Sequence, residues 1–396
     1  MDKKKTVVLG VTGGIAVYKA LDVVSRLKKK NIDVHVIMTK SATEFVGELS
    51  FRSLSQNPVV TDMFERPYTF DIEHISLAKK ADLFLILPAT ANIIGKIANG
   101  IADDMLSTTV MATRAPVVIA PAMNTFMYEN PIVQKNINLL KEYGYHFVEP
   151  LSGRLACGDV GKGKMESPEV IVEYAEMLLN DKKDLKGKNI LITAGPTRED
   201  IDPVRFITNK SSGKMGYSIA KAARDRGANV ILVTGPTSIN PPRFIETINV
   251  YSADEMYKAV INNIDRSDII IKSAAVADYS PLEVSNIKIK KSDETINISF
   301  KKNKDILKEV GQNKSSKIVV GFAAETNNVL ENAKLKLKNK NLDMIVANDV
   351  SMKDSGFDVD NNKVTIITNN SFKEYEILSK YEVANNILDE ILKIKR

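Results

Sequence analysis

The strongest constraint on the fold is an alternation of short β-branched runs with longer amphipathic stretches, which occurs twice along the chain. Such an alternation is typical of parallel strands that are joined by helices. In the first half we expect strands at 6–9, 33–38, 83–87 and 117–120, and a helix that runs from the turn at 10–14 to Lys30. These elements predict one α/β layer structure.

The second half follows the same plan after a polar, lysine-rich segment at 180–188, which predicts a linker between domains. At 396 residues the chain exceeds the size at which one hydrophobic core keeps growing. We therefore predict an α/β protein with two doubly wound domains, 1–187 and 188–396. In the second domain strands are expected at 190–193, 230–233, 269–271, 318–320, 344–346 and 364–367, and helices at 215–226, at 328–340 and at the end.

The net charge and the cysteine content limit which binding partners and which cellular compartment we expect. The formal net charge of +6 permits a polyanionic partner, but no interleaving of aromatic and basic residues indicates nucleic acid. Cys157 is the sole cysteine, so an internal disulfide is excluded, and the absence of an apolar signal segment predicts the cytoplasm. No apolar run approaches the roughly 20 residues of a membrane helix, so no membrane partner is expected.

A glycine-rich turn follows the first predicted strand. It includes Gly13 and Gly14, but the spacing does not fit the G-x-G-x-x-G fingerprint, and the later segment 212–215 does not fit a P-loop. A turn of this kind exposes backbone N–H groups at the positive end of a helix, which suits a phosphate. The residues alone leave open whether this turn binds an anion or is only a tight connection.

Cys157 lies in a glycine-dense, basic segment at 153–165 that predicts a mobile flap with an accessible thiol. His35 and His146 lie in or beside strands and are interpreted as structural residues. His74 opens a helix before the strand at 83–87, where its ring could face a cleft at the edge of the sheet. No cysteine and histidine spacing predicts a zinc site.

Polar residues also follow two other strands of the first half. Asn124 comes directly after the strand at 117–120, and the segment 88–92 follows the strand at 83–87. Carboxyl ends of parallel strands are where open α/β sheets bind ligands, so these loops are predicted to converge. A helix cap is an alternative role for Asn124.

In the second half, the polar segment 209–214 precedes a helix, and Asp278 follows a strand. Lys288, Lys290 and Lys291 come about ten residues later. A carboxylate with several lysines suits a nucleoside triphosphate and Mg²⁺, because the metal bridges phosphates and the amines offset their charge.

Taken together, these motifs resemble two known families. The segments 10–16, 74–78, 88–92, 121–124 and 153–158 resemble the flavin-dependent cysteine decarboxylase family. The segments 193–198, 209–216, 274–279 and 321–326 resemble the phosphopantothenate-cysteine ligase family. Fused in this order, they are similar to a family of bifunctional coenzyme A biosynthesis enzymes over nearly the whole chain.

For the first half, the resemblance implies a flavodoxin-like domain with FMN that decarboxylates phosphopantothenoylcysteine to 4′-phosphopantetheine. The substrate thiol would be oxidised to a thioaldehyde, CO₂ would leave, and the flavin would return the hydride. Cys157 would supply a proton, His74 would assist oxidative decarboxylation, and Asn124 would bind the substrate carboxylate. The implied FMN contacts are Gly13, Gly14, Thr39, Phe45, Ala89, Thr90 and Ser107.

For the second half, the resemblance implies a Rossmann-like ligase that activates 4′-phosphopantothenate with CTP and Mg²⁺, releasing pyrophosphate. The amine of cysteine would then displace CMP from the acyl cytidylate, which Asn209 would stabilise. Lys304 stands where the family has proline, a departure in the CTP loop. The implied CTP-binding residues are Ala274, Asp278, Lys288, Asp305, Ile306, Leu307, Phe322, Lys336 and Lys340.

The resemblance also implies a homo-oligomer in which trimer-based decarboxylase assemblies combine with ligase dimers, up to a dodecamer. Two alternatives remain at this stage. Only one half could be active, or the chain could be a flavin-binding regulatory or nucleic-acid-binding protein.

Overall fold

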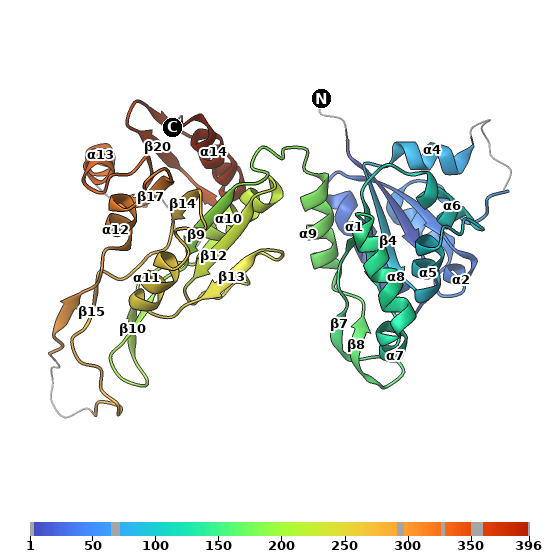
Figure 1. Cartoon of the computed structure of the whole chain (residues 1–396), viewed down its shortest axis with the longest axis horizontal. Coiled ribbons are helices and arrows are strands. Elements are labelled where there is room, and N and C mark those ends of the chain that lie inside the picture. Colours follow the sequence, from blue (N-terminus) through green and yellow to red (C-terminus); the bar gives the residue numbers. More distant parts are fainter. Residues whose placement is uncertain (1–3, 65–71, 291–296, 326–328, 350–358, 395–396) are drawn as a thin grey trace. The chain divides into compact units, whose positions relative to one another are not determined.

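The computed structural model describes residues 4–64, 72–290, 297–325, 329–349 and 359–394. It divides into two compact units, Met1–Asp181 and Lys182–Arg396 (Figure 1). Among the described residues, none of the helices has both the length and the apolar character needed to span a bilayer.

A six-stranded parallel sheet with the order β3-β2-β1-β4-β5-β6 forms the centre of the first unit. The order reverses between β1 and β4, so the loops after these two strands diverge and leave a crevice at the carboxyl edge of the sheet. The strands expected in this half are all present. Their bounds are β1 Thr6–Val11, β2 Asp33–Met38, β3 Val59–Val60, β4 Leu83–Ala89, β5 Val117–Pro121 and β6 His146–Phe147.

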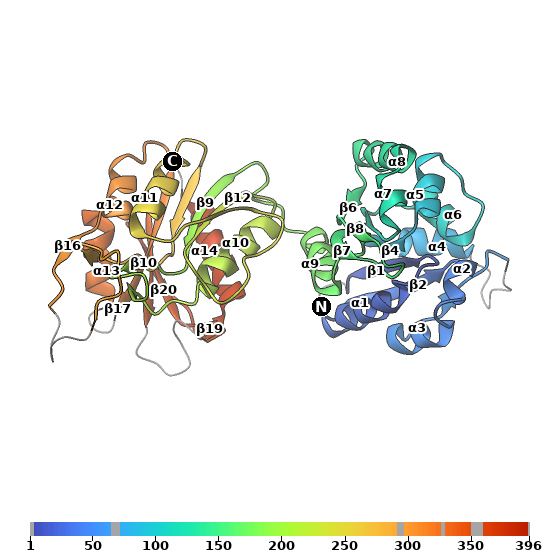
Figure 2. The same cartoon turned by 90° about the horizontal axis from the view of Figure 1, so that it is seen from below.

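Helices cover both faces of this sheet (Figures 1 and 2). Side chains of β4 alternate between two hydrophobic cores: Leu85 and Leu87 pack with α1, α3 and α9, whereas Phe84 and Ile86 pack with α4, α5, α6 and α8. A strand that is buried on both faces must be apolar throughout, which explains the continuous run in β4. The helices are α1 Val17–Lys29, α2 Lys40–Thr43, α3 Glu48–Ser55, α4 Glu73–Lys80, α5 Ala91–Ala98, α6 Met105–Ala112, α7 Thr125–Glu129, α8 Pro131–Glu142 and α9 Pro168–Leu179.

The glycine-rich segment expected to form a flap is an antiparallel hairpin of β7 (Leu151–Arg154) and β8 (Val160–Lys164). The Met123 N–H donates a hydrogen bond to the carbonyl of Gly163 over 3.0 Å. A Cβ atom at Gly163 would lie 2.3 Å from the Met123 carbonyl oxygen, and φ is +152° there. Glycine therefore allows the hairpin to dock against the loop after β5.

The second unit is built on an eight-stranded sheet with the order β13-β12-β9-β14-β17-β18-β20-β21, in which only the last two pairings are antiparallel. Its order reverses between β9 and β14. The strands are β9 Asn189–Ala194, β12 Asn229–Thr234, β13 Glu246–Asn249, β14 Ile269–Lys272, β17 Ile318–Glu325, β18 Met344–Asp349, β20 Val364–Thr368 and β21 Phe372–Glu374. Short pairs join β10 (Arg198–Asp200) to β11 (Phe206–Thr208), β15 (Tyr279–Pro281) to β16 (Phe300–Lys302), and β19 (Asn361–Asn362) to β22 (Leu378–Ser379).

One face of this sheet packs against α10 (Lys214–Asp225) and α14 (Lys380–Lys393), and the other against α11 (Ala253–Ile261), α12 (Ile306–Gln312) and α13 (Val329–Asn339). The predicted fold class, two doubly wound α/β domains, is thereby confirmed. The first six strands of both sheets have the Rossmann-type order, so the term flavodoxin-like describes the layered architecture of the first unit and not its strand order.

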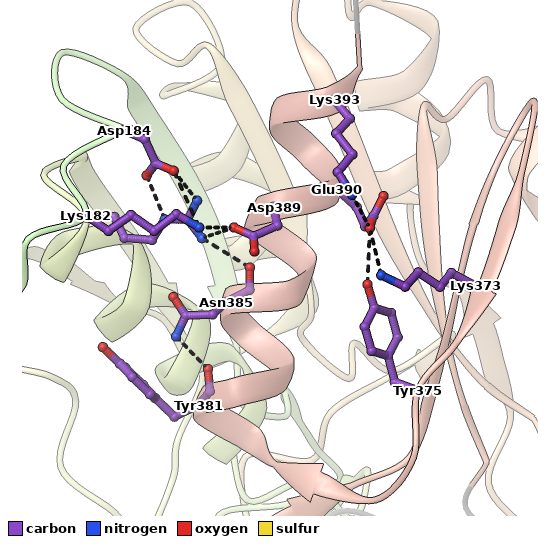
Figure 3. Close-up of polar contacts among 10 residues, drawn as sticks. Lys182, Asp184, Lys373, Tyr375, Tyr381, Asn385, Asp389, Glu390 and Lys393 are labelled. Carbon is purple, nitrogen blue, oxygen red and sulfur yellow. Dashed lines mark hydrogen bonds and ion pairs between the residues drawn. The ribbon is translucent and has the colours of Figure 1, made fainter. Parts of the chain in front are cut away.

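The segment predicted as a linker is largely part of the second unit. Leu185 is fully buried in that unit's core, and both carboxylate oxygens of Asp184 accept hydrogen bonds from the Arg226 guanidinium at 2.8 and 2.7 Å. Arg226 is fully buried and also forms an ion pair with Asp389, which Lys182 contacts as well (Figure 3). The units consequently divide after Asp181, six residues before the boundary expected after Gly187.

Candidate active sites

The turn after β1 is packed tightly against its neighbours in the first unit. A Cβ atom at Gly13 would lie 2.5 Å from the Cβ of Ser41, so only glycine fits. The Thr12 hydroxyl donates to the carbonyl of Pro88 over 2.7 Å and accepts from the Thr90 N–H over 3.1 Å. These bonds hold the loops after β1 and β4 together at the point where the strand order reverses.

A cavity of about 610 Å³ lies beside this turn. Gly13, Thr39 and Thr90, three of the expected flavin contacts, line it. The buried Thr39 hydroxyl has no hydrogen-bond partner among the described residues. An orphaned hydroxyl is costly unless a ligand satisfies it, so the cavity fits a group with acceptor oxygens such as the phosphate of FMN.

A second cavity of about 450 Å³ adjoins the first, since Gly13 and Thr90 line both. Gly14, Asn124 and Cys157 line this second cavity, and its remaining surface is largely apolar. The structure thus brings together the thiol, the amide and the glycine turn that the sequence placed far apart.

Asn124, Cys157 and Asp159 form one polar cluster at the mouth of the second cavity. The Asn124 amide nitrogen lies 2.6 Å from a carboxylate oxygen of Asp159 and 3.3 Å from the Cys157 sulfur. The Cys157 thiol lies 3.4 Å from the same Asp159 oxygen. Asn124 also caps α7, because its side-chain oxygen accepts from the Phe126 N–H over 2.8 Å. The capping role that the sequence left open for Asn124 is therefore present, and its side chain also lines the second cavity.

The base of the hairpin is held by Glu149. Its carboxylate accepts hydrogen bonds from Tyr128 at 2.7 Å, Lys141 at 2.7 Å and Lys162 at 3.0 Å. Burial would raise the pKa of Glu149, but these three donors outweigh that effect and lower it to about 2. Glu149 is therefore ionised at neutral pH and ties β8 to α8.

Four predicted residues of this half lie outside both cavities. His74 is half-buried on α4, and Phe45 is half-exposed after α2. Ala89 is fully buried at the end of β4, and the Ser107 hydroxyl donates to Asp104 over 2.9 Å, completing the cap of α6.

The other two histidines have internal partners, as their structural interpretation requires. His35 lies 3.0 Å from an Asp33 oxygen, and His146 lies 3.2 Å from the Tyr174 hydroxyl.

The second unit contains a pocket of about 470 Å³ at the carboxyl edge of its sheet. Nearly all residues predicted to bind CTP line it, together with the predicted Asn209. Lys288 is the exception, because it lies exposed on the chain between β15 and β16. The predicted residues in the lining are Asn209, Ala274, Asp278, Asp305, Ile306, Leu307, Phe322, Lys336 and Lys340.

Hydrogen bonds hold the predicted side chains in the pocket. The Asn209 amide donates to the Ala275 carbonyl over 3.1 Å, and Lys336 donates to the Phe322 carbonyl over 2.9 Å. Asp305 caps α12 and pairs with Lys340 at 2.9 Å. Burial would raise the pKa of Asp305, but Lys340 and the helix N–H groups lower it.

Lys304, which stands where the resemblance leads us to expect proline, leaves the cap by Asp305 intact. Its ammonium lies 4.3 Å above the Tyr257 ring and 3.8 Å from Asp254. The Lys304 side chain thus contacts α11.

Sequence reasoning missed Lys272 and Asn348, which also line the pocket. Burial lowers the pKa of Lys272 to about 8, with Lys340 and Lys336 adding to this effect and Asp305 opposing it. No described residue forms a hydrogen bond or ion pair with Lys272, and the buried side-chain oxygen of Asn348 is likewise unpartnered within the described chain. The signal available for Lys272 was its position at the end of a strand, two residues before Ala274.

Within the described ranges, no three histidine, cysteine, aspartate or glutamate side chains cluster as metal ligands. Asp278 and Asp305 are the acidic residues among the described pocket lining. A divalent cation would therefore take most of its ligands from nucleotide phosphates and water.

Comparison with known proteins matches both units to family models. The model described as "Flavoprotein" matches residues 1–180, and "DNA/pantothenate metabolism flavoprotein C-terminal domain" matches residues 185–394. The fold and the sites thus define a flavoprotein joined to a pantothenate-metabolism domain.

Relatives of full length extend this match. The chain is 51% identical over 400 residues to the coenzyme A biosynthesis bifunctional protein CoaBC of Bacillus subtilis (strain 168), covering 100% of this chain and 98% of that one. It is 45% identical over 392 residues to the protein of the same name from Escherichia coli (strain K12), covering 98% and 97%. The chain belongs to this family of bifunctional coenzyme A biosynthesis proteins, and it is an enzyme with a decarboxylase half and a ligase half.

Solved structures match each half separately. The crystal structure of a CoaBC C-terminal domain is 48% identical, with a TM-score of 0.46, and covers 53% of this chain and 96% of that one. A PPC decarboxylase mutant complexed with pantothenoylaminoethenethiol is 31% identical, with a TM-score of 0.41, and covers 44% and 98%.

Proposed function

We propose that the second unit joins cysteine to 4′-phosphopantothenate with CTP, and that the first unit decarboxylates the product to 4′-phosphopantetheine with FMN. The observation that carries this proposal is the contact of Asn124 with Cys157 at 3.3 Å, beside a cavity that adjoins the expected flavin cavity. This arrangement places a proton donor beside an amide that can bind a carboxylate, at the mouth of one cavity. It suits a decarboxylation that ends with protonation of carbon.

In the ligase pocket, lysine side chains would bind the triphosphate. Lys336, Lys340 and Lys272 line this pocket together with Asp305, and their positive charge would offset the charge that develops on the leaving pyrophosphate. The Asn209 amide stands at the pocket wall to stabilise the acyl cytidylate. The cysteine amine would then attack the acyl carbon and release CMP.

In the decarboxylase unit, Gly13, Gly14, Thr39 and Thr90 would hold FMN, with the Thr39 hydroxyl donating to its phosphate. Bound FMN supplies a two-electron acceptor for the substrate thiol and returns the same electrons after CO₂ has left. Asn124 would orient the carboxylate through its amide N–H. Cys157 would donate a proton to the carbon that lost CO₂, so the overall reaction has no net redox change.

His74 and Phe45 lie away from these cavities, and we propose that a second copy of the chain brings them to a shared site. Exposed apolar residues near them, such as Ile72 and Leu49, each 64% exposed, support a homo-oligomer. Lys288 of one copy would likewise reach the ligase pocket of another copy. We also propose that Mg²⁺ enters with CTP, and that this metabolic enzyme acts in the cytoplasm.

The test is reconstitution with the full chain. Supplying 4′-phosphopantothenate, cysteine, CTP, Mg²⁺ and FMN should yield 4′-phosphopantetheine, CMP, pyrophosphate and CO₂. Omission of CTP should stop all products, whereas removal of FMN should stop the reaction at phosphopantothenoylcysteine. Protein that binds no FMN and releases no CMP would refute the proposal.

Cys157→Ser should leave ligation unchanged and slow formation of 4′-phosphopantetheine by about 100-fold or more, because a general acid contributes about that factor. A decarboxylated, oxidised intermediate should accumulate and be detected by mass spectrometry. Ser152→Ala, in the same hairpin, is the control. Normal product formation by Cys157→Ser would remove the thiol from the mechanism.

A further inference from the structure

Asp159 contacts Asn124, the residue that we propose to bind the substrate. Its carboxylate lies 2.6 Å from the Asn124 amide nitrogen, the group proposed to bind the substrate carboxylate. An internal carboxylate and the substrate carboxylate cannot both sit on this amide, because two ionised groups at such a distance repel each other.

Asp159 is not needed to orient the amide. The Asn124 side-chain oxygen already accepts from the Phe126 N–H over 2.8 Å, which fixes the amide with its nitrogen toward the cavity. The contact with Asp159 therefore adds a ligand to an amide that is already positioned.

Asp159 also lacks a fixed cationic partner. Within the described residues, Asn124 and Cys157 are the side chains that contact its carboxylate, and neither is a lysine or arginine that could form an ion pair with it. Asp159 directly precedes β8, and the turn closes there through a hydrogen bond from the Leu155 N–H to the Asp159 carbonyl at 2.8 Å. The carboxylate can therefore leave the amide without breaking an ion pair.

The base of the hairpin is fixed independently of this tip. The Met123 N–H bond to Gly163 and the Lys162 ion pair with Glu149 both lie beyond Asp159 in β8. Displacing the carboxylate would therefore move the turn with Cys157, two residues away, while the hairpin stays docked.

We infer that Asp159 is a positioning residue that responds to whether a carboxylate sits on Asn124, and so times the approach of the Cys157 thiol to the carbon that loses CO₂. This inference rests on the proposed decarboxylase function. The substrate carboxylate displaces Asp159 and moves the Cys157 thiol away with the turn. After CO₂ leaves, Asp159 returns to the amide and brings the thiol back within 3.3 Å of it.

The returning thiol then meets the carbon from which CO₂ departed, since that carbon was held next to Asn124. Its proton goes to this carbon and is taken up by the electron pair of the broken C–C bond. The two electrons removed when the substrate thiol was oxidised return to the neighbouring carbon, so the overall reaction has no net redox change.

Binding to the full-length, FMN-loaded protein tests the inference with two unreactive probes. These are 4′-phosphopantothenoylserine, which has the carboxylate but no thiol, and 4′-phosphopantothenoylethanolamine, which lacks both. Asp159→Ala and Asp159→Asn should bind the serine probe about tenfold more tightly, the order of one charge-assisted hydrogen bond. The ethanolamine probe should change less than about twofold.

Rapid quenching with phosphopantothenoylcysteine supplies the second readout. In Asp159→Ala, CO₂ release should keep its rate while 4′-phosphopantetheine forms at least about tenfold more slowly, because the thiol is no longer returned to Asn124. Lys162→Met, which loosens the base of the hairpin but leaves this cluster intact, is the control.

Equal changes for both probes, weaker serine binding, or the same pattern in Lys162→Met would overturn the inference while the decarboxylase assignment stands. If wild-type protein binds neither probe, the decarboxylase assignment fails and the inference fails with it.

Discussion

At the level of single residues, the ligase pocket is lined by more lysine than acidic side chains. Lys336 and Lys340 each have a protein partner, in the Phe322 carbonyl and Asp305. Lys272 has none among the described residues, although it is half-buried at the end of β14. A buried amine without a partner is costly, and a bound anion would remove that cost.

The charge of Lys272 gives nucleotide binding a pH dependence. Because its pKa is lowered to about 8, the amine is charged below that pH and neutral above it. An anion binds the charged form better, so the affinity for CTP should fall as pH rises through 8. Lys272→Met should bind CTP about tenfold more weakly at pH 7, the order of one hydrogen bond to a charged group.

Calorimetric titration with CTP from pH 6.5 to 9.5 at constant ionic strength measures this effect. Lys302→Met, at an exposed lysine of the same pocket, should keep the step near pH 8. If Lys272→Met shows the same fall in CTP affinity near pH 8, that fall is due to another titrating group.

Among the elements, the β7–β8 hairpin combines a fixed base with a turn that carries Cys157. Glu149 secures the base through Lys162, and glycines at 161 and 163 let β8 lie against the loop after β5. A Cβ atom at Gly161 would lie 2.6 Å from Thr125, which is too close for any other residue. The hairpin thus presents the exposed Cys157 thiol on its turn.

The Glu149 contacts should stabilise the hairpin at neutral pH and lose this effect in acid. The folded-state pKa is lowered to about 2, below the ordinary value of about 4.3, so the contribution is complete above pH 5 and is lost as pH falls toward 2. Glu149→Gln should reduce protection of hairpin amides by less than about 1 kcal/mol, because the group is half-exposed.

Hydrogen exchange of residues 151–164 between pH 3 and 7 measures this difference, which should narrow below pH 4. Glu142→Gln, at an exposed carboxylate of α8, should match wild type at every pH. A constant difference across the range would mean that the ionised carboxylate is not the stabilising group.

At the scale of the whole molecule, two units with separate cores share one chain. The second begins with Lys182 and Asp184, which are bound through Arg226 and Asp389 to α10 and α14 (Figure 3). Arg226 also lowers the pKa of Asp184, mainly by hydrogen bonding. A fully buried arginine shared by two carboxylates is a contact that only the complete second unit can form.

Arg226→Met should destabilise the second unit by about 3 kcal/mol or more, because it leaves two carboxylates without their buried partner. The first unit should be unaffected, since its core contains none of these residues. In the full chain, urea unfolding of ligase activity should shift to lower concentration while flavin release does not.

Arg266→Met, which removes an exposed pair with Glu246, should change stability by less than about 1 kcal/mol. A parallel shift of flavin release in Arg226→Met would show that the two units unfold together.

The sequence by itself determined the two-domain α/β plan, the family and most of the ligase pocket. The two-domain plan depends on local patterns, because hydrophobic runs mark the buried strands, and residues such as Asn124, Ala274 and Asp278 follow strands whose carboxyl ends lie at one edge of their own sheet. The other residues of the ligase pocket, such as Asp305 and Lys340, were predicted from the family resemblance. Strand ends are fixed by nearest neighbours in the chain, so their convergence could be predicted.

Only the tertiary structure decided which side chains meet across long separations. Asp159 on the amide of Asn124, Lys272 without a partner among the described residues, and Asp184 bound to Arg226 each depend on packing between distant segments. Packing also left His74 and Lys288 outside the pockets that their motifs predicted. A motif specifies which residue types the chemistry requires. The orientation, burial and charge of those side chains depend on neighbours that only the folded chain brings together.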